Sequence, residues 1–114
     1  MNYLRNRPKL IFIEKHPIFK IKGENDSEPF EIKVTSFMQL TRCPNTAIVT
    51  GTVIDGIIAK GNVITIEFPE GNPIDEVAEN IQICKQDVLD AIKGQQIGIQ
   101  LSKTTYKELL TLSN

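Results

Sequence analysis

The stretch 47–68 limits the possible folds of this chain more than any other, because its apolar residues alternate along it as they do in a β-strand. On an extended backbone, Val49 and Val53 fall on one face, while Ile48 and Ile54 fall on the other. Branched aliphatic residues of this kind suit a pleated, half-buried surface. The stretch is therefore predicted to form two strands and their connection rather than a helix.

Three glycines interrupt this stretch at five-residue intervals. Gly51 falls in the middle of the first predicted strand, where a missing side chain is typical of the close approach of another backbone. Gly56 follows Asp55, and Gly61 is the third residue of the predicted turn 59–62. Both of these positions favour a positive φ, which glycine adopts without a steric penalty.

Two segments on either side of these glycines have the pattern of barrel strands. The segment 63–68 places Ile64 and Ile66 on one face and a mixed set of residues on the other, as in a barrel wall. The segment 30–41 is predicted to be a strand that carries a bulge beyond Val34, where the alternation becomes irregular.

The C-terminal part of the chain is predicted to add two strands and a short helix. Apolar residues alternate through 74–85 and again through 97–101, which predicts a strand in each segment. Thr105 and Glu108 have the spacing of a capping box, in which each side chain bonds the backbone N–H of the other residue. A short helix is therefore expected to begin at this point.

The segment 86–93 between those strands is short and mixed in composition. It is predicted to form one helical turn with Val88, Leu89 and Ile92 facing inward. Gly94 follows it, as a glycine commonly follows the C-terminus of a helix.

The N-terminal region is predicted to be an arm outside the barrel. The segments 9–14 and 18–22 resemble two short strands, and 23–29 is rich in turn formers and acids, which is typical of a linker. We therefore expect an all-β protein: an arm and linker over 1–28, packed on a small closed antiparallel β-barrel over 29–114 that ends in the short helix.

Three segments resemble a known family in the same order along the chain: PFEIKVTSFMQL at 29–40, TAIVTGTVIDGIIAKGNVITI at 46–66 and AIKGQQIGIQL at 91–101. They are similar to the second, β-barrel domain of translational GTPases, the elongation factor Tu family. In the middle segment the resemblance is carried by Thr50, Gly51, Val53, Gly56, Ile58 and Gly61. It implies a stand-alone barrel of that type that binds RNA or a ribonucleoprotein. The chain has no GxxxxGK[ST] phosphate loop, so GTP binding is not expected.

The chain departs from this family at two places that matter for function. Thr35, Ser36 and Met38 stand where the tRNA-carrying members have two acids and an aromatic residue, so binding of a charged tRNA end by their route is not expected. The family's Arg-Gly before the next strand is replaced by residues 45–46, although Arg42 lies close by and can substitute for that arginine.

A third departure concerns closure of the barrel. In the family a strand led by glycine follows the segment near residue 110 and closes the barrel, whereas this sequence ends at residue 114 without one. An open barrel would expose unpaired backbone groups, which folded proteins cover. We therefore expect residues 10–13 or 18–21 to supply the missing pairing, either within one chain or across a dimer.

Charge is distributed unevenly along the chain. Residues 1–22 contain six basic residues and one acidic residue, whereas the remainder contains seven basic and thirteen acidic residues. A basic arm on an acidic barrel can contact a phosphate backbone. Alternatively, these basic residues pair with the acids of the barrel or are simply solvated. The candidate phosphate contacts are Arg5, Arg7, Lys9, Arg42 and Lys60.

Residues for catalysis or metal binding are not expected. The single histidine, His16, has no serine or cysteine near it in sequence to activate. Asp75, Glu76 and Glu79 lack a nearby histidine and any known ligand spacing, so a solvated face is expected rather than a metal site. The sequence predicts no catalytic, cofactor or metal site, and hence a protein that is not an enzyme.

The cysteines and the hydropathy of the chain indicate its surroundings. Cys43 and Cys84 are too few for a disulfide framework and are expected to be free thiols, which suits a reducing cytoplasm. No apolar run approaches the length of a membrane span. A cytoplasmic protein without a membrane partner is therefore expected.

Two functions remain as alternatives. The first is a module that binds RNA or a ribonucleoprotein, as the resemblance implies. The second is a protein interaction or assembly module, monomeric or dimeric through an edge strand, that binds no nucleic acid. A barrel of this type hosts unrelated functions, so the fold alone does not choose between them.

Overall fold

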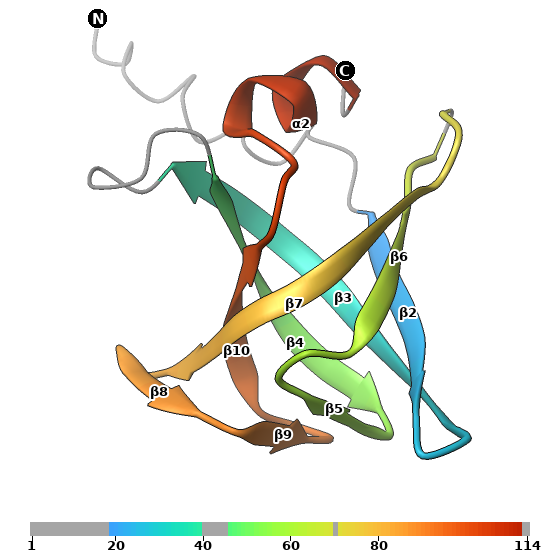
Figure 1. Ribbon diagram of the computed structural model, residues 1–114, viewed down its shortest axis with the longest axis vertical. Helices are drawn as coiled ribbons and strands as arrows, with labels where there is room; N and C mark the ends of the chain where they lie inside the picture. Colours follow the sequence, from blue (N-terminus) through green and yellow to red (C-terminus); the bar gives the residue numbers. More distant parts are fainter. Residues whose placement is uncertain (1–18, 40–45, 70, 113–114) are drawn as a thin grey trace, which may run out of the picture.

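The computed structural model describes residues 19–39, 46–69 and 71–112, and these form a closed barrel of six antiparallel strands (Figure 1). Neighbouring strands pair in the order β10-β4-β3-β2-β6-β7, and β7 pairs with β10 to close the barrel. Its strands are β2 (Lys20–Asn25), β3 (Glu28–Gln39), β4 (Ala47–Asp55), β6 (Val63–Glu67), β7 (Ile74–Ile83) and β10 (Gln96–Leu101). The all-β, closed antiparallel barrel expected from the sequence is confirmed.

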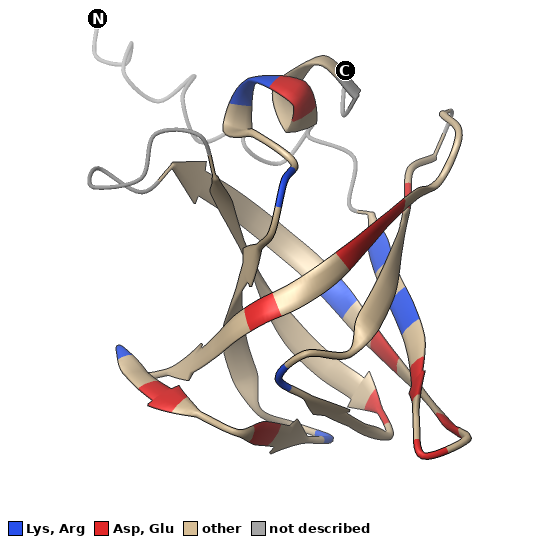
Figure 2. Cartoon of the chain, viewed as in Figure 1, with Lys and Arg blue, Asp and Glu red and all other residues tan. Residues whose placement is uncertain are grey.

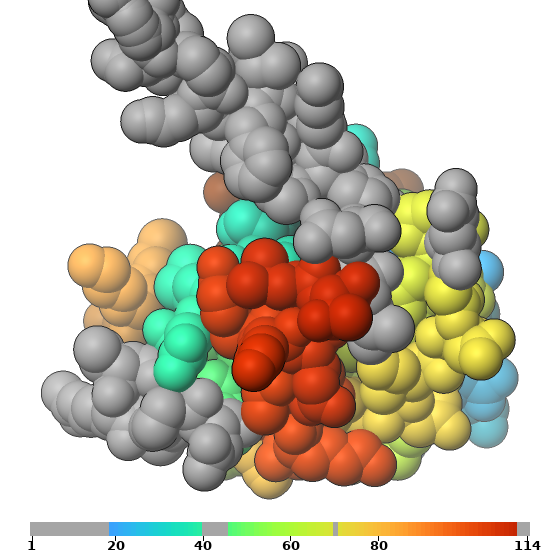
Figure 3. Space-filling view, turned by 90° about the horizontal axis from the view of Figure 1, so that it is seen from above, coloured from blue at the N-terminus to red at the C-terminus, as the bar shows by residue number. Residues whose placement is uncertain are grey.

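Smaller elements lie at the two ends of the barrel. At the lower end in Figure 1, β5 (Ile57–Ala59) pairs with β9 (Asp90–Ile92) in a separate ribbon of two strands, and β8 (Gln86–Val88) extends β7. Helix α2 (Tyr106–Leu112) covers the opposite end. Seen from above that end, the residues of the C-terminal segment lie between those of β3 and those of β7 (Figure 3).

The core lies inside the barrel and is filled by the inward face of each strand. The alternation predicted for 47–55 is confirmed, because Val49 and Val53 are buried while Ile54 is exposed. On β6 the predicted face of Ile64 and Ile66 is also buried. Each aliphatic side chain removed from water in this way stabilises the fold by about 1.5–3 kcal/mol.

Aromatic rings and the helix fill the upper end of the barrel. The ring centroid of Phe19 lies 5.1 Å from that of Phe68 and 5.9 Å from that of Phe37, and the Phe37 ring lies 5.4 Å from the Tyr106 ring. Leu109 of the helix is fully buried. The short helix expected at the C-terminus is confirmed, and it seals this end of the core.

The predicted capping box holds the start of that helix. The backbone N–H of Glu108 donates to Oγ1 of Thr105 at 3.1 Å, and the backbone N–H of Thr105 donates to Oε1 of Glu108 at 2.9 Å. Two N–H groups that the helix leaves without backbone partners are thereby satisfied.

The glycines in 47–61 have the roles predicted for them. A Cβ on Gly51 would lie 2.2 Å from the backbone oxygen of Lys33, so β3 and β4 approach each other closely at this point. Gly56 and Gly61 have φ values of 72° and 91°, and the N–H of Asn62 donates to the oxygen of Ala59 across the predicted turn. The bulge expected beyond Val34 is present as a shift in the β3–β4 register.

Strand β2 is one of the six strands of the barrel wall. It lies between β3 and β6, and Ile21 is opposite Ile32 on one side and Ile66 on the other. The expectation that 18–21 supplies the missing pairing is confirmed for Lys20 and Ile21, within one chain. The other candidate, 10–13, lies outside the described residues.

The stretch 23–29, interpreted from the sequence as a linker, is instead the hairpin that joins β2 to β3. Its residues pair across the hairpin up to Asn25 and Glu28, and the turn residues Asp26 and Ser27 have φ values of 53° and 70°. Two successive positive φ values match the right-handed twist of the flanking strands, so a turn without glycine still forms a tight hairpin. Of the predicted arm, 9–14 lies outside the described residues.

The helical turn predicted for 86–93 is wrong. Cys84 and Lys85 have φ values of 52° and 68° and form a tight turn that sends the chain back as β8 along β7. Leu89 and Ile92 are therefore exposed, by 78 % and 52 %, rather than packed inward, whereas Val88 is partly buried against the core as predicted. The other predicted strands of this half, over 74–85 and 97–101, are confirmed as β7 and β10.

No helix within the described ranges is both long enough and apolar enough to cross a membrane.

Candidate functional site

Of the basic residues proposed for phosphate contact, the structure places one. Lys60 is exposed in the turn between β5 and β6. Hydrogen bonds from Gln82 and Asn80, with the nearby charge of Lys60, hold the pKa of Asp87 below its usual range. The remaining candidates lie outside the described residues: Arg5, Arg7, Lys9 and Arg42.

Other lysines lie on β2 and β3 (Figure 2), and their side chains are exposed. Lys20 stands opposite Lys33, and both are exposed. The Nζ of Lys20 lies 3.3 Å from a carboxylate oxygen of Glu31, and the Nζ of Lys22 lies 3.6 Å from one of Glu67. Exposed pairs of this kind add little stability. They do reduce the positive field that this wall presents to a phosphate backbone.

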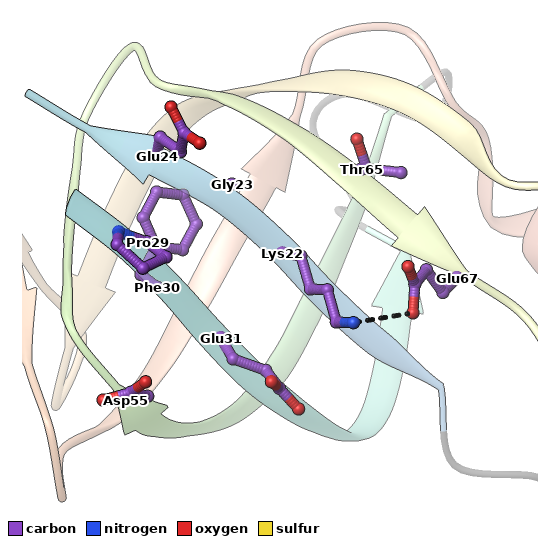
Figure 4. Close-up of a pocket in the computed structure, with 9 residues that line it drawn as sticks. All are labelled: Lys22, Gly23, Glu24, Pro29, Phe30, Glu31, Asp55, Thr65 and Glu67. Carbon is purple, nitrogen blue, oxygen red and sulfur yellow. Dashed lines mark ion pairs between the residues drawn. The ribbon is translucent and has the colours of Figure 1, made fainter. Parts of the chain in front are cut away.

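Beside these lysines the outer wall is hollowed, and carboxylates dominate the hollow (Figure 4). The cavity has a volume of about 450 Å³, and Glu24, Glu31, Asp55 and Glu67 line it together with Lys22. Across the described residues, eight basic side chains stand against twelve acidic ones. A phosphate backbone would be repelled from this hollow.

Two of the positions at which the sequence departs from the tRNA-carrying proteins, Thr35 and Ser36, form hydrogen bonds with Thr50 on the neighbouring strand β4. Oγ1 of Thr35 donates to the backbone oxygen of Thr50 at 3.2 Å, and Oγ of Ser36 lies 2.5 Å from Oγ1 of Thr50. These hydroxyls sit on the outside of the β3–β4 wall at the bulge. They are neutral and partly engaged with one another, so this part of the wall offers no charge to a ligand.

The lower end of the barrel carries exposed apolar side chains on the β5–β9 ribbon. Ile57 stands directly opposite Ile92, and the two side chains are exposed by 45 % and 52 %. The next pair along the ribbon, Ile58 and Ala91, is fully buried against the core. Because adjacent residues of a strand face opposite ways, burying the second pair turns the first pair toward solvent.

Leu89 is a further exposed apolar residue at the other end of the ribbon, beyond the pair Ala59 and Asp90. Its backbone oxygen accepts a hydrogen bond from the N–H of Lys60 at 2.8 Å, which holds the 78 % exposed side chain at the end of the ribbon. We call Ile57, Leu89 and Ile92 the ribbon patch. Sequence reasoning missed it, although Ile57 and Ile58 are adjacent and cannot both face the core if the segment is a strand.

A second feature missed by the sequence is the buried carboxylate of Glu76. Predicted on a solvated face, it is 2 % exposed, because the alternation in β7 turns Glu76 inward with Ala78. Its Oε1 accepts hydrogen bonds from the N–H of Val77 at 2.9 Å and from the N–H and Oγ of Ser102 at 2.9 and 2.6 Å. Its Oε2 accepts from the N–H groups of the next two residues, 103 and 104.

These bonds determine what Glu76 can do. Burial would raise the pKa of its carboxyl group, but hydrogen bonds involving Ser102, Thr104 and Val77 outweigh burial and lower the pKa to about 2. A carboxylate so fully bonded has no lone pair free for a substrate proton. It fastens the segment after β10 to β7, which makes it a structural group rather than a catalytic one.

Of the other residues for which no catalytic or metal-binding role was predicted, the structure describes some and not others. Oδ1 of Asp75 accepts a hydrogen bond from Oγ1 of Thr65 at 3.0 Å, and Cys84 is an exposed free thiol at the β7–β8 turn. Cys43 and His16 lie outside the described residues. Within the described part of the chain, no three His, Cys, Asp or Glu side chains are grouped so as to hold a metal ion.

No protein-family model, curated protein or solved structure matches this chain. The resemblance to the translational GTPases therefore stays a prediction from the three sequence segments.

Proposed function

We propose that this chain is a non-catalytic binding module, cytoplasmic in location, that docks another protein on the ribbon patch. The observation that carries the proposal is the exposed pair Ile57 and Ile92, held rigidly because its neighbours Ile58 and Ala91 are part of the core. Apolar side chains clustered at a rigid surface are typical of interaction sites.

A strand edge offers a further route for the same docking. Strand β8 ends the sheet order, so among the described residues it has a strand partner on one side only. A strand of another protein, or of a second copy of this chain, can pair with the free edge.

The experiment compares proteins retained from cell lysate by the immobilised full chain and by two variants. Ile57→Asp combined with Ile92→Asp places charge on the ribbon patch, and we expect at least about tenfold less retained partner, equivalent to about 1.4 kcal/mol. Met38→Asp is the matched control, since Met38 is 48 % exposed on β3 near the opposite end. It should retain the partner as the unchanged chain does, and nuclease treatment should make no difference.

Equal retention by both variants would contradict docking on the ribbon patch. Unfolding does not explain a loss, provided that both variants show the far-UV circular dichroism and urea midpoint of the unchanged chain. Substitutions at exposed positions usually change stability by no more than about 0.5 kcal/mol.

Binding of RNA or a ribonucleoprotein is the second candidate function, as the sequence resemblance implies. The observation in its favour is the pair Lys20 and Lys33, which lies where the basic segment 1–22 enters the barrel. Under this alternative, affinity for a structured RNA falls steeply with salt, and changing Arg5 and Arg7 to alanine makes the slope shallower. Lack of measurable binding at low salt would rule it out.

A further inference from the structure

The end of the barrel that carries the ribbon patch is also rich in unpaired negative charge. Glu24, Asp26 and Glu28 surround the turn of the β2–β3 hairpin, and Asp55 ends β4 (Figure 2). All four side chains are exposed.

These carboxylates lie beside the ribbon rather than elsewhere on the barrel. Gly56, which precedes the ribbon, is in such close contact with the hairpin that a Cβ on it would lie 2.2 Å from the backbone oxygen of Pro29. Asn25 is the last residue of β2, and Asn62 lies in the turn after the ribbon strand β5. The side-chain amide of Asn62 donates a hydrogen bond of 3.4 Å to Oδ1 of Asn25. The acidic hairpin therefore lies directly beside strand β5, which carries Ile57.

Lys60 and Lys93, both exposed, directly follow the two ribbon strands, but within the described ranges neither they nor the lysines of the neighbouring wall form an ion pair with these four carboxylates. In the described ranges the ion pairs are those of Lys20 with Glu31 and of Lys22 with Glu67. The four carboxylates around the hairpin have no ion-pair partner there. Such a surface attracts cationic segments and repels acidic ones, and the discrimination against like charge is large once a partner covers it.

The hollow shown in Figure 4 adjoins the hairpin and continues the negative surface along the wall. Pro29 and Phe30 form part of its lining, and carboxylates of Glu24 and Asp55 stand at its rim. Its volume of about 450 Å³ is in the range of clefts that hold a ligand group.

We infer that the partner of the ribbon patch is a protein segment that combines apolar side chains with lysine or arginine. Its apolar side chains cover Ile57 and Ile92, and its cationic side chains reach Glu24, Glu28 and Asp55. This inference rests on the proposed docking function and adds to it the chemistry of the partner.

The test titrates the isotopically labelled full chain with three synthetic decapeptides and records backbone amide shifts by NMR. One peptide alternates Lys and Ile, the second alternates Glu and Ile, and the third alternates Lys and Ser. We expect the first to bind at least about tenfold more tightly than either of the others. The shifted amides should fall in residues 24–29, 55–59 and 90–93, and binding should weaken as salt rises.

Charge reversal provides the matched variants. Glu24→Lys combined with Glu28→Lys should lower the affinity for the Lys-Ile peptide about tenfold or more. Glu79 is an exposed acid on β7, so Glu79→Lys should leave that affinity unchanged. Asp26 is left unchanged because its φ of 53° is needed for the hairpin turn.

The outcomes separate this inference from the function on which it rests. Equal binding of the Glu-Ile or Lys-Ser peptide, shifts on another face, or no binding at all would overturn the inference. If a protein from lysate still depends on Ile57 and Ile92 in that case, docking stands and only the partner's chemistry is wrong. If binding of the peptide and binding of a lysate protein are both independent of the ribbon patch, the inference and the proposed docking function are both wrong.

Discussion

Replacing Glu76 with glutamine is expected to lower the free energy of unfolding by about 3 kcal/mol. The carboxylate accepts hydrogen bonds from Val77, Ser102, Lys103 and Thr104, and an amide would turn an NH₂ group toward some of these donors. Buried donors without an acceptor carry their full desolvation cost. Urea unfolding at neutral pH measures the loss.

Glu79→Gln is the matched control for this prediction, because Glu79 lies on the same strand and is exposed. It should change the free energy of unfolding by no more than about 0.5 kcal/mol. Similar losses for the two variants would show that Glu76 does not fasten the segment after β10.

The same carboxylate should make the free energy of unfolding depend on pH in the acid range. The pKa of Glu76 is lowered from 4.5 to about 2 in the folded chain, so the unfolded chain binds its proton first as the pH falls. The stability due to Glu76 is therefore fully present above about pH 4.5 and is lost progressively toward about pH 2. Accordingly, the difference in the free energy of unfolding between the unchanged chain and Glu76→Gln should become smaller as the pH falls through that range. A difference that stays constant with pH would contradict this explanation.

Gly51→Ala is expected to have the other large effect, a loss of about 3 kcal/mol in the free energy of unfolding. The added methyl group would lie 2.2 Å from the backbone oxygen of Lys33, and that oxygen cannot move without opening the β3–β4 pairing. Thermal and urea unfolding of the variant measure the loss.

Gly98→Ala provides the comparison on the neighbouring strand β10. Its added methyl group would meet the side-chain Cγ2 of Ile48 at 3.4 Å, and a side chain can adjust where a backbone cannot. We expect a change below about 1 kcal/mol, since alanine also restricts the unfolded chain more than glycine does. If the two variants lose similar stability, the close approach at Gly51 is not what requires a glycine there.

The barrel could be predicted from the sequence because its determinants are local. Alternation placed Val49, Val53 and Ile66 in the core, and the spacing of Gly51, Gly56 and Gly61 located a close approach and two turns. Both patterns involve residues only a few positions apart, so they can be recognised in a single sequence.

The errors came from features that depend on distant residues or on unusual turns. Apart from the N–H of Val77, the donors that allow Glu76 to be buried lie 26 or more residues away in the sequence, so nothing near it distinguishes it from a solvated acid. The turns at Asp26–Ser27 and Cys84–Lys85 contain no glycine, and sequence reasoning interpreted one as part of a linker and the other as leading into a helix.

The candidate site was less predictable than the fold. The uneven charge directed attention to the basic residues of the N-terminal segment, of which the structure describes Lys20 and Lys22 in the wall of the barrel. The exposure of Ile57 and Ile92 follows from the pairing of β5 with β9, two strands more than 30 residues apart, which neither strand reveals alone.

Hydrogen–deuterium exchange of the full chain, with and without the protein that it retains from lysate, tests the central claim most directly. The account predicts slower amide exchange in residues 54–60 and 88–93 on binding, with residues 35–38 and 48–52 of the β3–β4 wall unchanged. Protection confined to that wall or to residues 1–22, with none on the ribbon patch, would contradict it.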